Sequence, residues 1–175
     1  MKARITLLFV AVAAMLASGC CLRFTDQTPN TTFHVGDIIK TSGTNIVVEK
    51  FQWGNGNWTT SGKAVVDTRN YSSGSGNDLN TNNVNLRFLF SYPVEKISFK
   101  FGEWGGNNNI KVNNDFKNVQ NLVSLNGTTI GGAQVTVNVI QQGNNQYGNM
   151  TIEGNINNFS IGGQELWLDD VCTRK

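Results

Sequence analysis

The stretch VNLRFLFSYPVEKISFKF, residues 84–101, alternates apolar and polar side chains with a period of two. The apolar positions that share a face within each half are Val84, Leu86, Phe88 and Phe90, then Ile97, Phe99 and Phe101. This period is typical of strands buried on one face only. Because the SYP segment between the halves is short, the sequence predicts two strands joined as a hairpin.

The same alternation recurs on both sides of this stretch. It is clear in AQVTVNVI (133–140) and NMTIEGNI (149–156), which are separated by a segment rich in turn-forming residues. Further candidate strands cover 33–39, 45–53, 62–68 and 165–171. No segment after residue 19 keeps a helical period, and we expect at most one helical turn, around 115–122. About eight to ten short strands with Gly/Asn turns predict an all-β chain, an antiparallel β-sandwich of jelly-roll type.

The first 19 residues have the composition of an export signal. Lys2 and Arg4 precede an apolar run over residues 5–16, and small residues follow it. The run is shorter than the roughly 20 apolar residues that a membrane span requires. Residues 20–175 then form a single domain of ordinary size. The formal charge of +2 gives no reason to expect a nucleic-acid partner.

The segment LASGC (16–20) resembles the lipobox of bacterial lipoproteins, in which the cysteine is acylated after cleavage. This resemblance implies lipidation of Cys20 and a membrane contact made only through the lipid anchor. The alternative is ordinary signal cleavage near Gly19, which would leave a freely secreted protein. One acyl chain by itself anchors a protein only marginally.

The chain has three cysteines, Cys20, Cys21 and Cys172. Exported proteins form disulfides, and three cysteines allow one intramolecular bridge. If Cys20 carries lipid, Cys21 and Cys172 remain as a pair, and we expect them to be bridged. The alternative is a free, buried Cys172 with both other cysteines near the membrane.

Several segments together resemble a group of uncharacterised exported β-sandwich proteins. The matching pieces include CLRFTD (21–26), TTFHVGD (31–37), FKFGEWGGNNNIKVNNDF (99–116) and GGQELWLDDVC (162–172). An opening acidic strand and a closing DDV strand also look, more distantly, like those of jelly-roll carbohydrate-binding modules and galactose-binding-like domains.

The distant resemblance implies that the first and last strands are neighbours, which would bring Cys21 close to Cys172. In such modules, acidic residues on these strands hold a structural calcium ion. Here the corresponding residues are Asp26, Asp169 and Asp170. Arg23 departs from the acidic pattern of the group, so an aspartate could pair with it instead. Calcium requires six to eight oxygen ligands, and no other cofactor is expected.

The sequence gives little support for an enzyme. His34 is the only histidine, and the sequence contains no G-x-S-x-G motif. There is therefore little support for a serine–histidine–aspartate triad, which would have to use His34. Glu103 precedes Trp104, but no second carboxylate stands at a short strand spacing from it, as glycoside hydrolysis would require. We therefore expect a protein without catalytic activity.

Two short segments combine tryptophan, glycine and asparagine: WGNGNW (53–58) and WGGNNN (104–109). Sugar rings stack on aromatic side chains, and amides pair with hydroxyls. The candidate ligand-binding residues are Trp53, Asn55, Asn57, Trp58, Trp104, Asn107, Asn108 and Asn109. They predict a cell-surface module that binds carbohydrate. The alternative is a structural or adhesive protein with protein partners, in which the asparagines form turns and the tryptophans pack separately.

Overall fold

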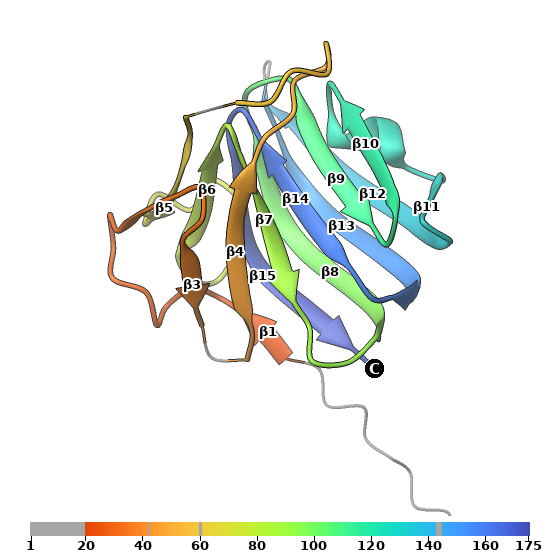
Figure 1. Ribbon diagram of the computed structural model, residues 1–175, viewed down its shortest axis with the longest axis horizontal. Helices are drawn as coiled ribbons and strands as arrows, with labels where there is room; N and C mark the ends of the chain where they lie inside the picture. The colour runs from red at the N-terminus through yellow and green to blue at the C-terminus, as the bar shows by residue number, and fades with distance from the viewer. Residues whose placement is uncertain (1–19, 42, 60, 143–144) are drawn as a thin grey trace, which may run out of the picture.

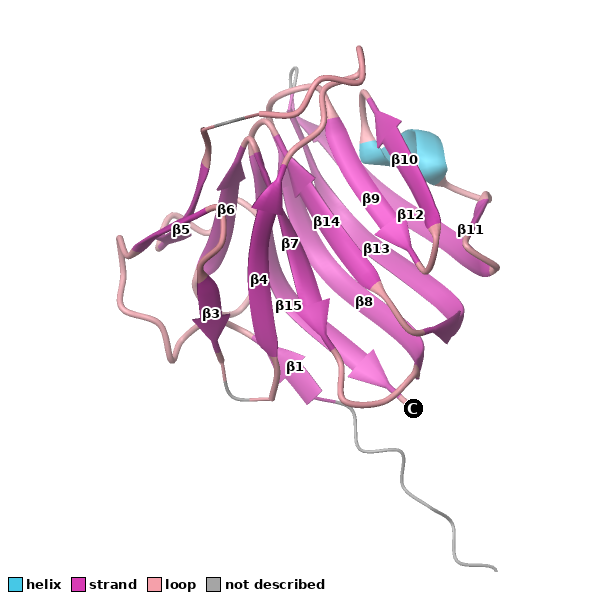
Figure 2. Ribbon diagram, viewed as in Figure 1, coloured by secondary structure: helices cyan, strands magenta, loops and turns pink. Residues whose placement is uncertain are grey.

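The computed structural model describes residues 20–41, 43–59, 61–142 and 145–175. The predicted export signal, residues 1–19, lies outside the described residues. Figure 1 shows two layers of strands packed face to face, and in Figure 2 nearly every element is a strand. Among the described residues, no helix combines the length and hydropathy needed to cross a bilayer.

One layer is a nine-stranded sheet in the order β11-β12-β13-β8-β15-β6-β5-β2, with β1 also paired to β15. All of its pairs are antiparallel. Its strands are β1 (Cys20–Leu22), β2 (Thr32–His34), β5 (Lys63–Asp67), β6 (Asp78–Asn82), β8 (Val94–Glu103), β11 (Thr129–Ile130), β12 (Ala133–Gln142), β13 (Asn145–Ile156) and β15 (Leu166–Arg174).

The other layer is a six-stranded antiparallel sheet in the order β10-β9-β14-β7-β4-β3. Its strands are β3 (Ile38–Lys40), β4 (Asn45–Lys50), β7 (Val84–Leu89), β9 (Asn108–Val112), β10 (Asp115–Val119) and β14 (Phe159–Gly163). A single 3-10 turn, η1 (Leu122–Leu125), follows β10. The helical turn expected around 115–122 therefore falls later, because residues 115–119 pair with β9.

The predicted antiparallel β-sandwich is confirmed, but the predicted hairpin within residues 84–101 is wrong. Strand β7 pairs with β4 and β14, whereas β8 pairs with β13 and β15 in the other sheet. The SYP segment thus carries the chain from one layer to the other. Two strands that are apolar on one face can cover each other across a core as well as lie side by side, and here they do the former.

The core lies between the sheets and contains the side chains that the alternation predicts to face inward. The buried ones among them are Val84, Leu86, Phe88, Ile97, Phe99, Phe101, Ala133, Val135, Val137, Met150, Ile152 and Ile156. Phe159 of β14 contacts Phe88 and Phe99 with ring centroids 5.5 and 5.9 Å apart, which joins the two layers. Full burial of a valine, leucine, isoleucine, methionine or phenylalanine side chain stabilises the fold by about 1.5–3 kcal/mol.

The last strand, β15, occupies the interior of the nine-stranded sheet. It pairs with β8 along one side and with β6 and β1 along the other. The short strand β1 places Cys21 directly opposite Cys172, and the two form a disulfide. The predicted bridge is confirmed, and the alternative of an unbridged Cys172 is wrong.

A β-bulge interrupts β15 just before the disulfide. Asp169 is paired with Lys100 and Cys172 with Ser98, so β15 has one residue more than β8 over this interval. Asp170 has a φ of +46°, in the left-handed region. Such an extra residue re-aims neighbouring side chains. Leu168 and Val171 consequently both remain in the core.

Replacing both bridged cysteines, Cys21→Ser with Cys172→Ser, should lower the free energy of unfolding by about 4–5 kcal/mol. The bridge spans a sequence separation of 151 residues, and closing so long a loop removes much of the entropy of the unfolded chain. Urea denaturation of the wild type and of the double variant measures the difference. Wild-type protein in excess reductant should show the same loss, and an unchanged midpoint would contradict this account.

Candidate functional site

The WGNGNW segment forms a tight turn after β4. The Trp53 N–H donates to the Asn57 carbonyl over 2.8 Å, and the Asn57 N–H donates to Asn55 Oδ1 over 3.0 Å. Gly56 has a φ of +87°, which an L side chain rarely adopts. Asn55 is thus used by the turn itself, as a turn-forming asparagine is expected to be. The turn sets Trp58 opposite Gln52 and leaves Trp58 55% exposed.

Trp58 lines a groove on the outer face of the six-stranded sheet. The groove has a volume of about 610 Å³. The side chains that matter for its chemistry are Glu49, Lys50, Trp58, Asn85, Lys111 and Phe116, with Ser160 between them. Apart from Trp58, these residues lie on β4, β7, β14, β9 and β10, so the groove crosses five strands of the sheet. Figure 1 shows these five strands side by side.

The strand register explains why these residues are neighbours. Phe116 is paired with Lys111, and Lys111 is paired in turn with Ser160. A second row across the sheet consists of Asn118, Asn109, Gly162, Asn85 and Glu49. Their chain neighbours Leu86, Ile110 and Ile161 are buried in the core, so both rows face outward.

The second row is held in place by amide hydrogen bonds. Asn118 Nδ2 donates to Asn109 Oδ1 over 2.8 Å and to the Gln52 carbonyl over 3.1 Å. Asn85 Nδ2 donates to the Lys50 carbonyl over 2.9 Å. A Cβ on Gly162 would lie 2.6 Å from Asn85 Oδ1, so only glycine leaves room for this amide. The amides of this row are therefore fixed in orientation, and two members of the row, Asn85 and Glu49, line the groove.

Trp104 lies on the opposite outer face of the sandwich. At the end of β8 the alternation turns Glu103 inward and Trp104 outward. Its ring contacts Tyr71 and Trp167, with centroids 4.1 and 5.1 Å away, and it remains 40% exposed. Trp53 instead packs edge-on against Phe51 at 5.2 Å. The structure therefore does not bring the three predicted tryptophans onto one face.

The three asparagines of WGGNNN are also separated from one another. Asn108 points inward and donates to Glu103, whereas Asn109 belongs to the outward row. Asn107 lies near the first motif, since a Cβ on Gly54 would be 3.5 Å from Asn107 Oδ1. Asn57 is exposed on the turn. Of the predicted ligand-binding residues, Trp58 lines the groove, whereas Asn109 is buried in the outward row and is not part of the groove lining.

Sequence reasoning missed most of the groove. Lys50, Asn85, Lys111 and Phe116 lie on four different strands and only the pairing order makes them neighbours. The signal that could have found them is the alternation itself, since Asn85 and Lys111 each stand between two buried apolar residues.

Glu103 is a buried carboxylate, 3% exposed, that joins β8 to β9 and η1. It accepts hydrogen bonds from Asn108 Nδ2 over 2.9 Å and from the Leu122 N–H over 3.0 Å. Burial raises its pKa to about 7, against the lowering effect of these two donors. Its surroundings are those of a structural contact within the sandwich rather than of a group that faces the groove.

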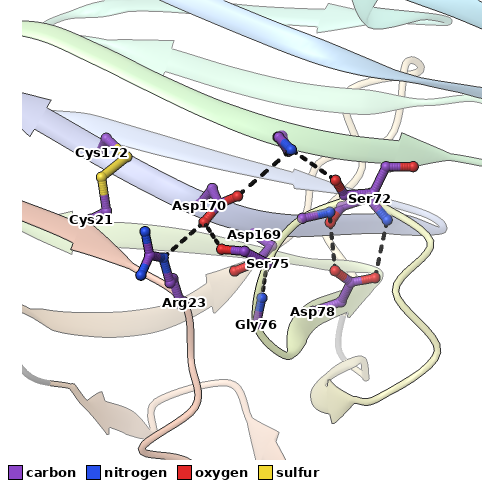
Figure 3. A network of polar contacts seen from close by, with 12 residues as sticks. Cys21, Arg23, Ser72, Ser75, Gly76, Asp78, Asp169, Asp170 and Cys172 are labelled. Atoms are coloured by element: carbon purple, nitrogen blue, oxygen red, sulfur yellow. Dashed lines mark hydrogen bonds and ion pairs between the residues drawn. A yellow bond between two sulfur atoms is a disulfide. The ribbon is translucent and has the colours of Figure 1, made fainter.

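The closing aspartates fasten a loop, residues 68–77, across the outer face of the nine-stranded sheet (Figure 3). Asp169 is completely buried and accepts the Gly76 N–H over 2.6 Å. Burial raises the pKa of Asp169 to about 6. Asp170 accepts from Ser75 Oγ over 2.6 Å and pairs with Arg23 over 3.2 Å. The pairing with Arg23, which the sequence left open, is therefore present.

These residues do not fit the calcium site that the resemblance implied. Asp26 lies on the exposed turn after β1 and accepts from Gln27 over 3.2 Å. Asp169 Oδ2 accepts the Gly76 N–H, and Asp170 Oδ1 accepts from the Ser75 hydroxyl and the Arg23 guanidinium. In the part of the chain that the structure describes, no three His, Cys, Asp or Glu side chains form a group that could hold a metal ion.

Comparison with known proteins identifies no relative of the chain. No protein-family model, curated protein or solved structure matches the chain.

The raised pKa of Glu103 predicts a specific pH dependence of stability. Glu103 ionises near pH 4.5 in the unfolded chain and near pH 7 in the folded one, so its contribution to stability is lost as the pH rises through this window. The loss amounts to about 2–3 kcal/mol between pH 5 and pH 8.

The variant Glu103→Gln cannot ionise and should lose less stability than the wild type over this interval. Urea denaturation at pH 5 and pH 8 compares the two proteins. Wild-type and variant curves that fall in parallel would show that Glu103 does not titrate in this range.

Proposed function

We propose that the protein is an exported, non-catalytic module that binds carbohydrate in the groove beside Trp58. The observation that carries the proposal is the combination of a half-exposed indole ring with polar and charged residues in one groove. Trp58 provides a flat apolar surface on which a sugar ring can stack. The Ser160 hydroxyl, which lines the same groove, suits a hydroxyl of such a ligand.

The size of the groove supports an oligosaccharide ligand. A volume of about 610 Å³ falls within the range of small-molecule sites. The groove crosses five neighbouring strands, from β4 to β10. At the usual strand spacing of about 4.8 Å, this corresponds to roughly 19 Å, which is longer than a single sugar ring.

Export and lipid attachment belong to the same proposal. The Cys21–Cys172 disulfide supports an oxidising compartment outside the cytoplasm. Cys20 immediately precedes the bridged cysteine at the start of β1. The segment after β4 that carries Trp58 lies at the end of the sandwich opposite β1 (Figure 1). A lipid on Cys20 would consequently place the segment that carries Trp58 at the end of the domain away from the membrane.

A glycan array tests carbohydrate binding, with Trp58→Ala as the disabling variant and Trp104→Ala as its matched control. Both substitutions remove an exposed tryptophan, but they do so on opposite faces of the sandwich. Loss of one stacking ring should weaken a hit at least tenfold, which corresponds to about 1.4 kcal/mol. Trp104→Ala should leave the hit within about twofold.

Circular dichroism and thermal denaturation establish that both variants are folded. The absence of any hit on a broad array, with the wild type folded, would favour the structural or adhesive alternative. Equal loss of glycan binding in both variants would show that the groove is not the binding site.

The lipid proposal is tested by fractionation of the producing cells. Cys20→Ala should move the protein from the membrane fraction to the soluble exported fraction, because the acyl chain would have no attachment site. Metabolic labelling with a fatty acid should mark the wild type only. Identical fractionation of the two proteins would instead favour ordinary signal cleavage.

A further inference from the structure

The groove contains two lysines whose charge is not compensated. Lys50 ends β4, and Lys111 lies in the outward row of β9. Among the described residues, neither lysine is within ion-pair distance of a carboxylate, whereas Lys96, Lys100 and Lys117 each have an acidic partner.

Among the described residues that line the groove, the one carboxylate, Glu49, does not cancel this charge. Glu49 pairs with Arg87, its neighbour on the next strand. The two form an internal ion pair with no net charge. The groove therefore has a local excess of two positive charges beside an exposed indole ring.

This excess is local and does not reflect a generally basic protein. The chain has 14 basic and 12 acidic residues, and Lys2 and Arg4 of the predicted signal account for the difference. Residues 20–175 thus carry equal numbers of basic and acidic side chains. An anion would be attracted to the groove because of the groove's own lysines and not because of the field of the whole molecule.

The position of the lysines suits a charged sugar chain. Lys111 lies between Phe116 and Ser160 in the register, and the Lys50 carbonyl accepts the Asn85 amide. Lys111 thus points out of the sheet beside Ser160, and the exposed Lys50 lines the same groove at the end of β4. A ligand that satisfies all of these groups has sugar hydroxyls, an apolar ring face and anionic substituents.

We infer that the groove selects an acidic oligosaccharide, one whose sugars carry carboxylate or sulfate groups that pair with Lys50 and Lys111. This inference rests on the proposed function and specifies its ligand class. The attraction is between partly exposed charges, so it weakens as salt increases.

Calorimetric titration of the full mature chain with a uronic-acid oligosaccharide tests the inference, alongside the same oligosaccharide with its carboxyl groups methyl-esterified. The acid form should bind at least tenfold more tightly at low salt. Lys50→Gln and Lys111→Gln should each weaken binding of the acid form about threefold to tenfold. Neither substitution should change binding of the ester. A sulfated oligosaccharide of the same length identifies which anionic group is preferred.

Lys117→Gln is the matched control variant. It removes the same charge from the neighbouring strand β10, but Lys117 pairs with Asp115 and is not part of the groove lining. The affinity of the Lys117→Gln variant for the acid form should stay within about twofold of that of the wild type. Equal weakening by Lys117→Gln would mean that net charge alone governs binding, which would overturn the assignment to the groove.

The outcomes separate this inference from the proposed function. Equal binding of acid and ester, lost in Trp58→Ala, would retain the carbohydrate module and overturn its preference for anions. Binding of polyglutamate that matches the oligosaccharide and is insensitive to Trp58→Ala would show a simple polyanion site and overturn both. No binding of any sugar would also overturn both.

Discussion

The fold depends on the insertion of the last strand into the interior of a sheet. Strand β15 supplies the pairing edge for β8 on one side and for β6 and β1 on the other. The nine-stranded sheet therefore cannot be completed until the C-terminal residues of the chain are available. Such long-range pairing makes folding slow compared with that of folds built from local contacts. The alternating apolar side chains of both sheets then bury each other only after this strand is in place.

The two outer faces of the sandwich are finished in different ways. The loop over residues 68–77 covers the nine-stranded sheet, where a Cβ on Gly102 would lie 2.3 Å from the Tyr71 carbonyl and one on Gly74 would lie 2.1 Å from Asp169 Oδ2. Glycines that permit a close approach of the loop, together with buried aspartates, thus close that face. On the six-stranded sheet, the turn that carries Trp58 and the segment with Val35 and Gly36 border the groove.

The sequence predicted which side chains face the core, because a period of two is a local property of extended chain. It did not predict which sheet each strand joins, and the expected hairpin within residues 84–101 failed for that reason. The adjacency of the first and last strands was suggested by resemblance and by the spacing of Cys21 and Cys172. The grouping of Lys50, Asn85 and Lys111 follows from pairing between distant strands, which no local pattern contains. The glycines and asparagines of the two tryptophan segments did not distinguish a turn from a sugar site, because both use these residues. The Asn55 side chain, for example, accepts a hydrogen bond within its own turn.

The bridge between Cys21 and Cys172 also has a mechanical consequence. A pulling force that enters the chain at Cys20 would, without the bridge, act on the three-residue strand β1 alone and peel it from the sheet. With the bridge, the tension passes through one covalent bond into β15, which is supported by hydrogen bonds along both of its edges. The load is then shared by the middle of the sheet in shear. A domain tethered at its first residue can in this way resist drag on whatever it holds without unravelling from the tether.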